Sequence, residues 1–423
     1  MVYTMGYKDI FDYVNSEEDK LDMKKVLLLA IGDELLSGIR RDTNCAGAAW
    51  LFHNAGWKIE EIEIIPDEQN VIVDTLNKWT GRVELIITSG GLGPTHDDRT
   101  RFAIAEYLKC GLEVDNAAYD IIAARYADPM RHWIEHSRPM QGLMPTAAKS
   151  IHNPTGSALG ILFESRNTKV YCFPGVPTEY KSMLQQEFGN ILKPSGGWTS
   201  IAIVGIAESA LKDHFNEIIE NQELHISILP SFGIVEFVIR GEPEAIAEAE
   251  RMARSILPGD CLPNGILNLP EAILYEAERM NKKIAFAESC TGGLIGAAMT
   301  EVPGISKVFM GSCVAYDNHP KRAILGVSED ILEVCGAVSP ECAAAMAIGA
   351  SKIYCADYAV SVTGIAGPDG GSDSKPVGLV WFGVQSHKGT RTFQRTLNGN
   401  RIMIRERAKT IALETMWREL KEE

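Results

Sequence analysis

The sequence lacks several features that would place it in particular classes of protein. No apolar run approaches the ~18 residues that a membrane-spanning helix needs. Its nine cysteines include no CxxC pair, which argues against both a disulfide framework and a zinc site and fits a reducing compartment. We therefore expect a cytoplasmic protein.

Positive charge is also scarce. The chain has 41 Lys and Arg against 56 Asp and Glu, a formal net charge of -15 at pH 7. General affinity for nucleic acid or for an anionic membrane requires clustered basic side chains. We expect neither as a partner, and we infer that the phosphates of any substrate are bound by a few local groups.

The composition otherwise suits several buried cores. A chain of 423 residues, 45% of them apolar, predicts two or three domains. The first 22 residues are polar and acidic, do not read as a secretory signal, and are expected to form a dispensable extension (1–22). Turn-rich breaks divide the rest into residues 23–195, 198–260 and 266–423.

The most informative stretch is AFAESCTGG, residues 285–293. An apolar strand runs into Ser289 and Thr291, and Gly292 and Gly293 then precede a helix. The first turn of a helix has free amides and a positive dipole end, so a nucleophile at Ser289 would have an oxyanion or phosphate site beside it. The alternative is that Ser289 or Thr291 only caps the helix.

A second strand end supplies a candidate base. Residues 308–314 read as a strand, and Tyr316, Asn318 and Lys321 follow it. A lysine whose charge is disfavoured by burial can deprotonate a serine, and a tyrosine hydroxyl can relay the proton. Ser289 and Lys321 are therefore a chemically sufficient pair.

A third strand-like run ends in the glycine-rich sequence VTGIAGPDGG. Glycine and threonine in such a loop are typical of phosphate binding, so we expect Thr363, Gly364 and Gly367 to position a nucleotide. All three strand ends thus carry small polar residues or glycine. In an open α/β sheet, a ligand binds at such ends.

Three further residues in this part of the chain have two interpretations each. Arg401 and Arg405, spaced i and i+4, share one helix face and are candidates for phosphate binding or a subunit contact. Alternatively, they form a solvated basic face. Cys290 could be a reactive thiol, but no histidine accompanies it, and we expect a small buried residue.

Near the start of the chain, apolar strands alternate with amphipathic helices, which predicts parallel β-α-β units. The expected strands are 24–32, 57–65, 83–89 and 169–173, and the expected helices are 44–56, 68–80, 99–112 and 116–126. Polar residues and glycines again collect at strand ends. Those expected to line a binding crevice are Asp67, Gly90, Gly91, Thr95, Asn153 and Gly175.

Asp97 and Asp98 are candidate metal ligands. Mg²⁺ usually takes one or two protein carboxylates together with substrate phosphates, so this pair, with Asp67, could hold Mg²⁺ or a similar divalent cation. The alternative is that one of them caps the helix that begins at Arg99. The neighbouring GGLG lacks the GxGxxG spacing of a dinucleotide site.

These motifs resemble the CinA family. AESCTGG, AYDNHPK, GAVSPE, VTGIAGPDGG, KPVGLV and GNRIMIR match, in order, its C-terminal domain, the nicotinamide-nucleotide amidohydrolases. The resemblance implies that Ser289 is the nucleophile and that Tyr316 and Lys321 assist it. IGDELLSG, TSGGLGPTHDDRT, NPTGSALG and FPGVPTEY resemble the molybdopterin-binding fold of its N-terminal domain, which implies a metal-dependent ADP-ribose pyrophosphatase.

Residues 198–260 read as β-α-β-β-α and resemble the KH-like middle domain of the same family. They lack a GxxG clamp and carry an acidic helix, so we expect a structural connector that binds no RNA. The predicted fold is therefore α/β with three domains: a molybdopterin-binding-like α/β domain, a small α+β KH-like connector, and a CinA C-terminal α/β amidase domain.

The resemblance implies a hydrolase that converts nicotinamide mononucleotide to nicotinate mononucleotide and ammonia, without a cofactor, and that also cleaves ADP-ribose with a divalent metal. We expect a homodimer. The alternative is a competence-linked binding or regulatory protein in which one or both sites are inactive.

Overall fold

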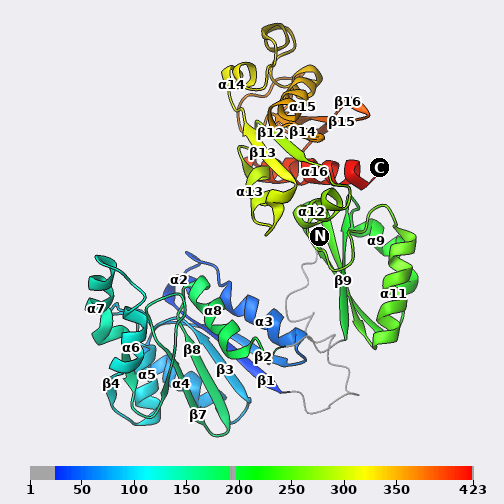
Figure 1. The fold of residues 1–423 in the computed structure, drawn as a ribbon. Coiled ribbons are helices and arrows are strands. Elements are labelled where there is room, and N and C mark those ends of the chain that lie inside the picture. Colours follow the sequence, from blue (N-terminus) through cyan, green and yellow to red (C-terminus); the bar gives the residue numbers. More distant parts are fainter. Residues whose placement is uncertain (1–23, 191, 193–196, 422–423) are drawn as a thin grey trace. The chain divides into compact units, whose positions relative to one another are not determined.

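The computed structural model in Figure 1 describes residues 24–190, 192 and 197–421. The predicted extension (1–22) lies outside the described residues. The chain divides into two compact units between Gly196 and Gly197. Among the described residues, no helix is long and apolar enough to cross a membrane.

The first unit is built on a six-stranded sheet with strand order β2-β1-β3-β8-β7-β6. The first four of these strands are parallel and confirm the predicted β-α-β units, whereas β7 and β6 are antiparallel and were not expected. The strands of the sheet are β1 (Lys25–Ile31), β2 (Lys58–Ile65), β3 (Leu85–Ser89), β6 (Lys149–Ile151), β7 (Gly160–Ser165) and β8 (Thr168–Phe173). A separate pair is formed by β4 (Leu112–Val114) and β5 (Leu143–Pro145).

The helices of this unit cover both faces of the sheet (Figure 1). They are α2 (Asp33–Leu36), α3 (Asn44–Asn54), α4 (Gln69–Trp79), α5 (Thr100–Leu108), α6 (Asn116–Ala123), α7 (Met130–Gln141) and α8 (Pro177–Phe188). Side chains of α3 and α8 pack on one face, and those of α4 and α5 pack on the other. Parallel strands covered on both faces become fully buried, and residues 26–30 of β1 have no exposed surface.

The expected helix at 99–112 is shorter than predicted. It ends at Leu108 because Lys109 adopts a left-handed conformation, with φ 52°, and Leu112 already belongs to β4. After α6 comes α7, which was not predicted because it contains Pro139 and few apolar residues.

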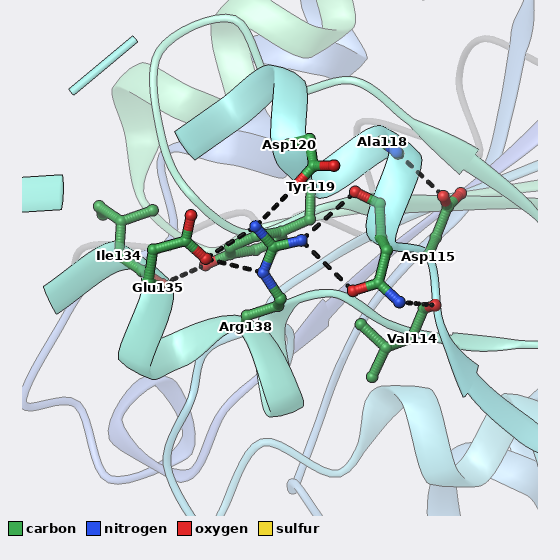
Figure 2. A network of polar contacts seen from close by, with 9 residues as sticks. Val114, Asp115, Ala118, Tyr119, Asp120, Ile134, Glu135 and Arg138 are labelled. Atoms are coloured by element: carbon green, nitrogen blue, oxygen red, sulfur yellow. Dashed lines mark hydrogen bonds and ion pairs between the residues drawn. The ribbon is translucent and has the colours of Figure 1, made fainter. Parts of the chain in front are cut away.

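Arg138 ties α7 to α6, as Figure 2 shows. Its Nη2 lies 2.7 Å from both Asp120 Oδ1 and Glu135 Oε2, and its guanidinium lies 5.1 Å from the Tyr119 ring centroid. The Tyr119 hydroxyl donates to Ile134 O at 2.9 Å. The helix pair thereby holds the end of α7 in place beside the glycine-rich loop that follows β3.

The second unit contains two sheets. The smaller has strand order β10-β11-β9 and is antiparallel, which confirms the predicted β-α-β-β-α segment. Its elements are β9 (Trp198–Val204), α9 (Glu208–His214), α10 (Asn216–Ile219), β10 (Leu224–Pro230), β11 (Ile234–Gly241) and α11 (Pro243–Ile256). The single helix expected after β9 is interrupted at Phe215, which is fully buried and leaves helical geometry with φ -111°.

The larger sheet has strand order β13-β12-β14-β15-β16. β12 pairs in parallel with both β13 and β14, while β15 and β16 add as an antiparallel hairpin. The strands are β12 (Ile284–Glu288), β13 (Phe309–Val314), β14 (Tyr358–Gly364), β15 (Leu379–Ser386) and β16 (Gly389–Thr396). The helices are α12 (Leu269–Arg279), α13 (Leu294–Thr300), α14 (Asn318–Ala323), α15 (Pro340–Tyr354) and α16 (Arg401–Lys421), with a 3-10 turn (Ile305–Lys307) and a π turn (Ile331–Cys335).

The two sheets of the second unit share a hydrophobic core. Ala202 and Val204 of β9 belong to the same buried cluster as residues of α12 and α16. Arg418 of α16 reinforces the junction, because its Nη2 donates to Val204 O at 3.2 Å and to Asp260 Oδ1 at 2.8 Å. The predicted connector is therefore packed against the C-terminal part within one compact unit.

Candidate functional site

Ser289 directly follows the central strand β12 of the larger sheet. Its amide donates to Val362 O of β14 at 2.9 Å, and only 7% of the residue is exposed. Gly292 and Gly293 then turn the chain into α13 with φ 61° and 96°, a left-handed conformation that favours glycine. The hydroxyl is thus fixed at a sharp strand-to-helix turn.

Lys321 reaches this turn from α14. Its Nζ lies 3.0 Å from Ser289 Oγ and donates to Ala315 O and Tyr316 O, both at 2.9 Å. Lys321 is 1% exposed. The structure therefore brings the two halves of the predicted pair within hydrogen-bonding distance.

Burial shifts the pKa values of Lys321 and of the neighbouring Cys290 in opposite directions. Desolvation lowers the pKa of Lys321 from its ordinary value, because a buried ammonium loses hydration. The same effect raises the pKa of the Cys290 thiol to about 11. At neutral pH, Lys321 is therefore the group that loses its proton more easily than usual, and Cys290 stays a thiol.

Glu288, which the sequence analysis did not single out, fills the start of α13. It is fully buried, and its carboxylate accepts from the amides of Gly293 at 2.9 Å, Ile295 at 3.1 Å and Gly296 at 2.9 Å. The hydroxyl of Ser312 donates to it at 2.7 Å. The expected anion site at this helix end is therefore occupied by the protein's own carboxylate. Glu288 is the last residue of the buried strand β12, and this position could have indicated that its carboxylate is buried and hydrogen-bonded within the protein.

Two backbone amides after Ser289 are candidates for binding an oxyanion. Gly292 N donates to Ser289 O at 3.0 Å, and Gly293 N donates to Glu288, so neither amide is free. Within the described residues, the amides of Cys290 and Thr291 have no such partner. Cys290 and Thr291 are the first and second residues after Ser289, so their amides are near the position where an oxyanion would form during attack by its hydroxyl.

Glu288→Ala is expected to lower the free energy of unfolding by about 3 kcal/mol, because it leaves buried amides without an acceptor. Glu288→Gln keeps one acceptor oxygen and should lose less. Urea denaturation followed by tryptophan fluorescence measures both, with Glu301→Ala, an exposed carboxylate just after α13, as the matched control. Equal stability of Glu288→Ala and Glu301→Ala would refute this role.

Arg401 and Tyr316 form a second pair near the site. Arg401 Nη2 donates to the Tyr316 hydroxyl at 2.7 Å, and its Nη1 donates to Gly367 O at 2.6 Å. Tyr316 is 57% exposed, and its backbone carbonyl rather than its hydroxyl contacts Lys321. The structure thus places the Tyr316 hydroxyl toward solvent and Arg401, and a proton relay through it stays a prediction.

Of the other predicted residues, some hydrogen-bond backbone carbonyls near the site and some are exposed. Arg405 donates to Cys290 O at 3.1 Å and Thr291 O at 2.8 Å, so part of its guanidinium holds the loop after Ser289. Thr363 is 1% exposed and donates to Ala337 O. Asn318, in contrast, is exposed at the start of α14.

A separate cleft of about 410 Å³ lies in the first unit, at the strand ends where the sequence analysis placed a crevice. The predicted residues that line it are Asp67, Gly90, Gly91, Asp97, Asp98 and Gly175. Gly90 and Gly91 have φ 115° and 68°, and a Cβ on Gly90 would lie 2.2 Å from Ile31 O. Only glycine therefore fits at Gly90.

The carboxylates of the predicted metal ligands differ in their exposure and in the hydrogen bonds that they already make. Both oxygens of Asp98 bind the preceding loop, accepting from Gly93 N at 2.7 Å and from Thr95 N and Oγ1 at 2.8 and 2.6 Å. Asp97 has a 60% exposed side chain. Asp67 accepts from Asp33 N at 3.0 Å, and burial raises the pKa of its carboxyl.

Asn153 braces another loop of this cleft. Its Oδ1 accepts from the amides of Thr155 and Gly156, and its Nδ2 donates to Ala158 O and to Glu179 Oε2. Asn153 is fully buried and does not line the cleft, whereas Ala158 and Glu179 do. It therefore acts on the cleft through the residues that it positions.

The relatives of this chain resemble it over nearly its whole length. The CinA-like protein of Fervidobacterium nodosum is 36% identical over 405 residues, which cover 94% of this chain and 98% of that protein. This chain belongs to the CinA family. The CinA-like protein of Thermosipho melanesiensis is 33% identical over 390 residues, 91% of this chain and 97% of that protein.

Family models match both halves of this CinA-family chain. The "CinA C-terminal domain" matches residues 267–420, which contain Ser289 and Lys321, and the "Probable molybdopterin binding domain" matches residues 27–193, which contain the cleft. Among solved structures, competence/damage inducible protein CihA from Agrobacterium tumefaciens is 42% identical with a TM-score of 0.34, covering 35% of this chain and 90% of that chain.

Two buried residues of this CinA-family protein were missed beside the cleft. Asn44 at the start of α3 donates to Ser89 Oγ at 2.8 Å and to Gly175 O at 2.9 Å, joining two strand ends. Arg101, fully buried, donates to Leu92 O at 2.5 Å beneath the glycine loop. A polar residue at the start of a predicted helix was a signal for Asn44, whereas nothing in the sequence separates Arg101 from an exposed arginine.

Proposed function

We propose that the site at Ser289 is an amidase that hydrolyses nicotinamide mononucleotide to nicotinate mononucleotide and ammonia. The observation that carries this proposal is the position of the Lys321 amine, between two carbonyl oxygens at 2.9 Å and the Ser289 hydroxyl at 3.0 Å. Carbonyl oxygens only accept, so they bind the two N–H groups of a neutral amine and leave its lone pair facing the serine. Lys321 in this state is oriented to act as a base.

The reaction then proceeds in two stages. Ser289 Oγ attacks the carboxamide carbon while Lys321 takes the hydroxyl proton, and the amides of Cys290 and Thr291 stabilise the oxyanion. Lys321 returns the proton to the departing nitrogen, the C–N bond breaks, and ammonia leaves an ester on Ser289. Water, deprotonated by Lys321, attacks this ester, and nicotinate mononucleotide leaves as Ser289 regains its proton.

The nucleotide part of the substrate would be bound by groups around the turn. Arg401 connects the Gly367 loop to the exposed hydroxyl of Tyr316, whose backbone carbonyl contacts Lys321. We propose that Arg401, with Asn318 and the Gly364–Gly367 loop, contacts the ribose phosphate. A guanidinium suits this role because it can donate two parallel hydrogen bonds to a phosphate.

Ammonia release from nicotinamide mononucleotide by the purified full-length chain tests the amidase. Nicotinamide riboside, which lacks the phosphate, is the matched control and should react more slowly. A chain that releases no ammonia from either compound would reject the amidase and leave a binding or regulatory role.

We propose further that the cleft of the first unit cleaves the diphosphate of ADP-ribose with the help of a divalent cation. Among the described residues, no three His, Cys, Asp or Glu side chains gather to hold a metal on their own. Asp67 and Asp97 are hard oxygen donors that line the cleft, and Mg²⁺ needs only one or two such ligands when substrate phosphates supply others. Bound there, Mg²⁺ would polarise a phosphoryl oxygen. Asp98 is not included, because both of its oxygens bind the loop.

Chelator is expected to reduce ADP-ribose cleavage to the background rate while ammonia release is unchanged, because the two sites lie in different units. Asp67→Asn should raise the Mg²⁺ concentration needed for half-maximal cleavage. Asp74→Asn, on the exposed side of α4 and outside the cleft, is the control. Cleavage that persists in chelator would reject the cation.

A further inference from the structure

Arg40 and Arg41 are the cationic side chains among the described residues that line the cleft of the first unit. Both are exposed. Six carboxylates line the same cleft, those of Glu34, Asp42, Asp67, Asp97, Asp98 and Glu179. A polyanionic ligand is repelled by most of this surface, so its most favourable contacts are with the two arginines.

Three of the carboxylates are held by other donors, as described above for Asp98. The oxygens of Asp42 accept from the amides of Asn44, Cys45 and Ala46 at the start of α3, at 3.1 to 3.3 Å. Glu179 accepts from Asn153 at 2.6 Å. These three carboxylates therefore bond to backbone amides, to Thr95 or to Asn153, and none of these bonds is to an arginine.

The two guanidinium groups themselves are uncommitted. In the part of the chain that the structure describes, neither makes an ion pair or a side-chain hydrogen bond with another residue. Two adjacent arginines without such pairs are available for an external anion.

The backbone under the arginines is nonetheless fixed. Ser37 N donates to Asp33 O at 2.9 Å, and Arg40 N donates to Glu34 O at 3.0 Å, which folds the chain back after α2. Gly38 makes this turn with φ 73°, a conformation that favours glycine. The turn keeps both side chains at the cleft, so little backbone ordering is needed when a ligand binds.

We propose that Arg40 and Arg41 bind the diphosphate group of the ligand in this cleft, which makes the site selective for compounds that carry a nucleoside diphosphate. The inference rests on the proposed cleavage of ADP-ribose for the choice of ligand. Each guanidinium can donate two parallel hydrogen bonds to phosphate oxygens. Neighbouring arginines match the two phosphates of a diphosphate better than the single phosphate of a mononucleotide.

Equilibrium binding by calorimetry tests this proposal with three probes, namely ADP-ribose, AMP and adenosine. The double variant Arg40→Ala/Arg41→Ala should bind ADP-ribose about 10²-fold more weakly, since hydrogen bonds between charged groups are lost. AMP should lose less and adenosine nothing. Arg40→Lys/Arg41→Lys keeps the charge without the paired donors and should recover part of the affinity.

The matched control is Arg131→Ala, an exposed arginine on α7 that does not line the cleft. It should bind all three probes as the unchanged chain does. An equal loss for adenosine and ADP-ribose, or unchanged ADP-ribose affinity in the double alanine variant, overturns the arginine role, as does a chain that does not bind ADP-ribose. A chain that binds ADP-ribose through these arginines but never cleaves it supports this inference and rejects only the proposed cleavage.

Discussion

Ser289→Ala is expected to reduce ammonia release from nicotinamide mononucleotide by a factor on the order of 10⁵, because the group that forms the covalent ester is removed. The residue is 7% exposed, and no other side chain than Lys321 bonds its hydroxyl among the described residues. The fold should therefore survive, and the melting temperature should stay close to that of the unchanged chain. Ammonia is measured under saturating substrate, with melting followed in parallel.

Cys290→Ala is the matched control for this prediction. The thiol is next to Ser289 and equally buried, but its pKa of about 11 keeps it protonated at neutral pH. We expect this variant to lose less than about tenfold, because its backbone amide still reaches the oxyanion. The Ser289 assignment would have to be abandoned if Cys290→Ala were inactive and Ser289→Ala retained substantial turnover.

Lys321→Met is expected to lower kcat by about 10²- to 10⁴-fold, the range that a positioned general base contributes. Methionine has a similar length and suits a buried position, so the change removes the amine with little change in packing. Three hydrogen bonds, to Ala315 O, Tyr316 O and Ser289 Oγ, are lost. Arg322→Ala, next to Lys321 on α14, removes an exposed ion pair with Glu329, which lies beyond that helix; this variant is the control and should keep full activity.

The pH dependence separates a base from a structural lysine. Only the neutral amine can accept the Ser289 proton, so kcat/KM should rise with pH until Lys321 is fully deprotonated. Burial lowers the pKa of Lys321 below its ordinary 10.5, so the midpoint of this rise should lie below that pH. In Lys321→Met the rise should disappear. A rise of the same midpoint in the variant would assign the titration to another group.

Much of the fold could be predicted from the sequence. Parallel strands that are buried on both faces are continuous apolar runs, and β1, β3, β12 and β14 were all predicted from such runs. β16 was missed because Phe393 is the one large apolar residue in GTRTFQRT, so an edge strand with a polar outer face leaves little pattern. α7 was missed for the reasons given above, and the contacts of Arg138 with Asp120 of α6 and with Glu135 could not be read from its sequence.

The sequence indicated which residues lie at the candidate site. It was less informative about which contacts each of them makes. The structure places Ser289 and Lys321 3.0 Å apart, because both follow neighbouring strands, β12 and β13, whose carboxyl ends meet at one edge of the sheet. Arg405 was one of two candidates for phosphate binding or a subunit contact, and its guanidinium donates to two carbonyls of the loop after Ser289. Asp98 is likewise a residue type that often binds metals, but both of its carboxylate oxygens accept hydrogen bonds from the loop that precedes it.

The sequence by itself determined which segments become strands and which polar residues stand at their ends, because strand periodicity and turn residues are local properties. Only the tertiary structure decided which hydrogen-bonding groups remain free there. Glu288 took the amides at the start of α13, and the Cys290 and Thr291 amides were left for a ligand. Among the described residues, Arg40 and Arg41 form no ion pair, and the adjacent Asp42 bonds amides at the start of α3. The physical reason is that each donor and acceptor is satisfied by its neighbours in space, and residues distant in the sequence compete for it.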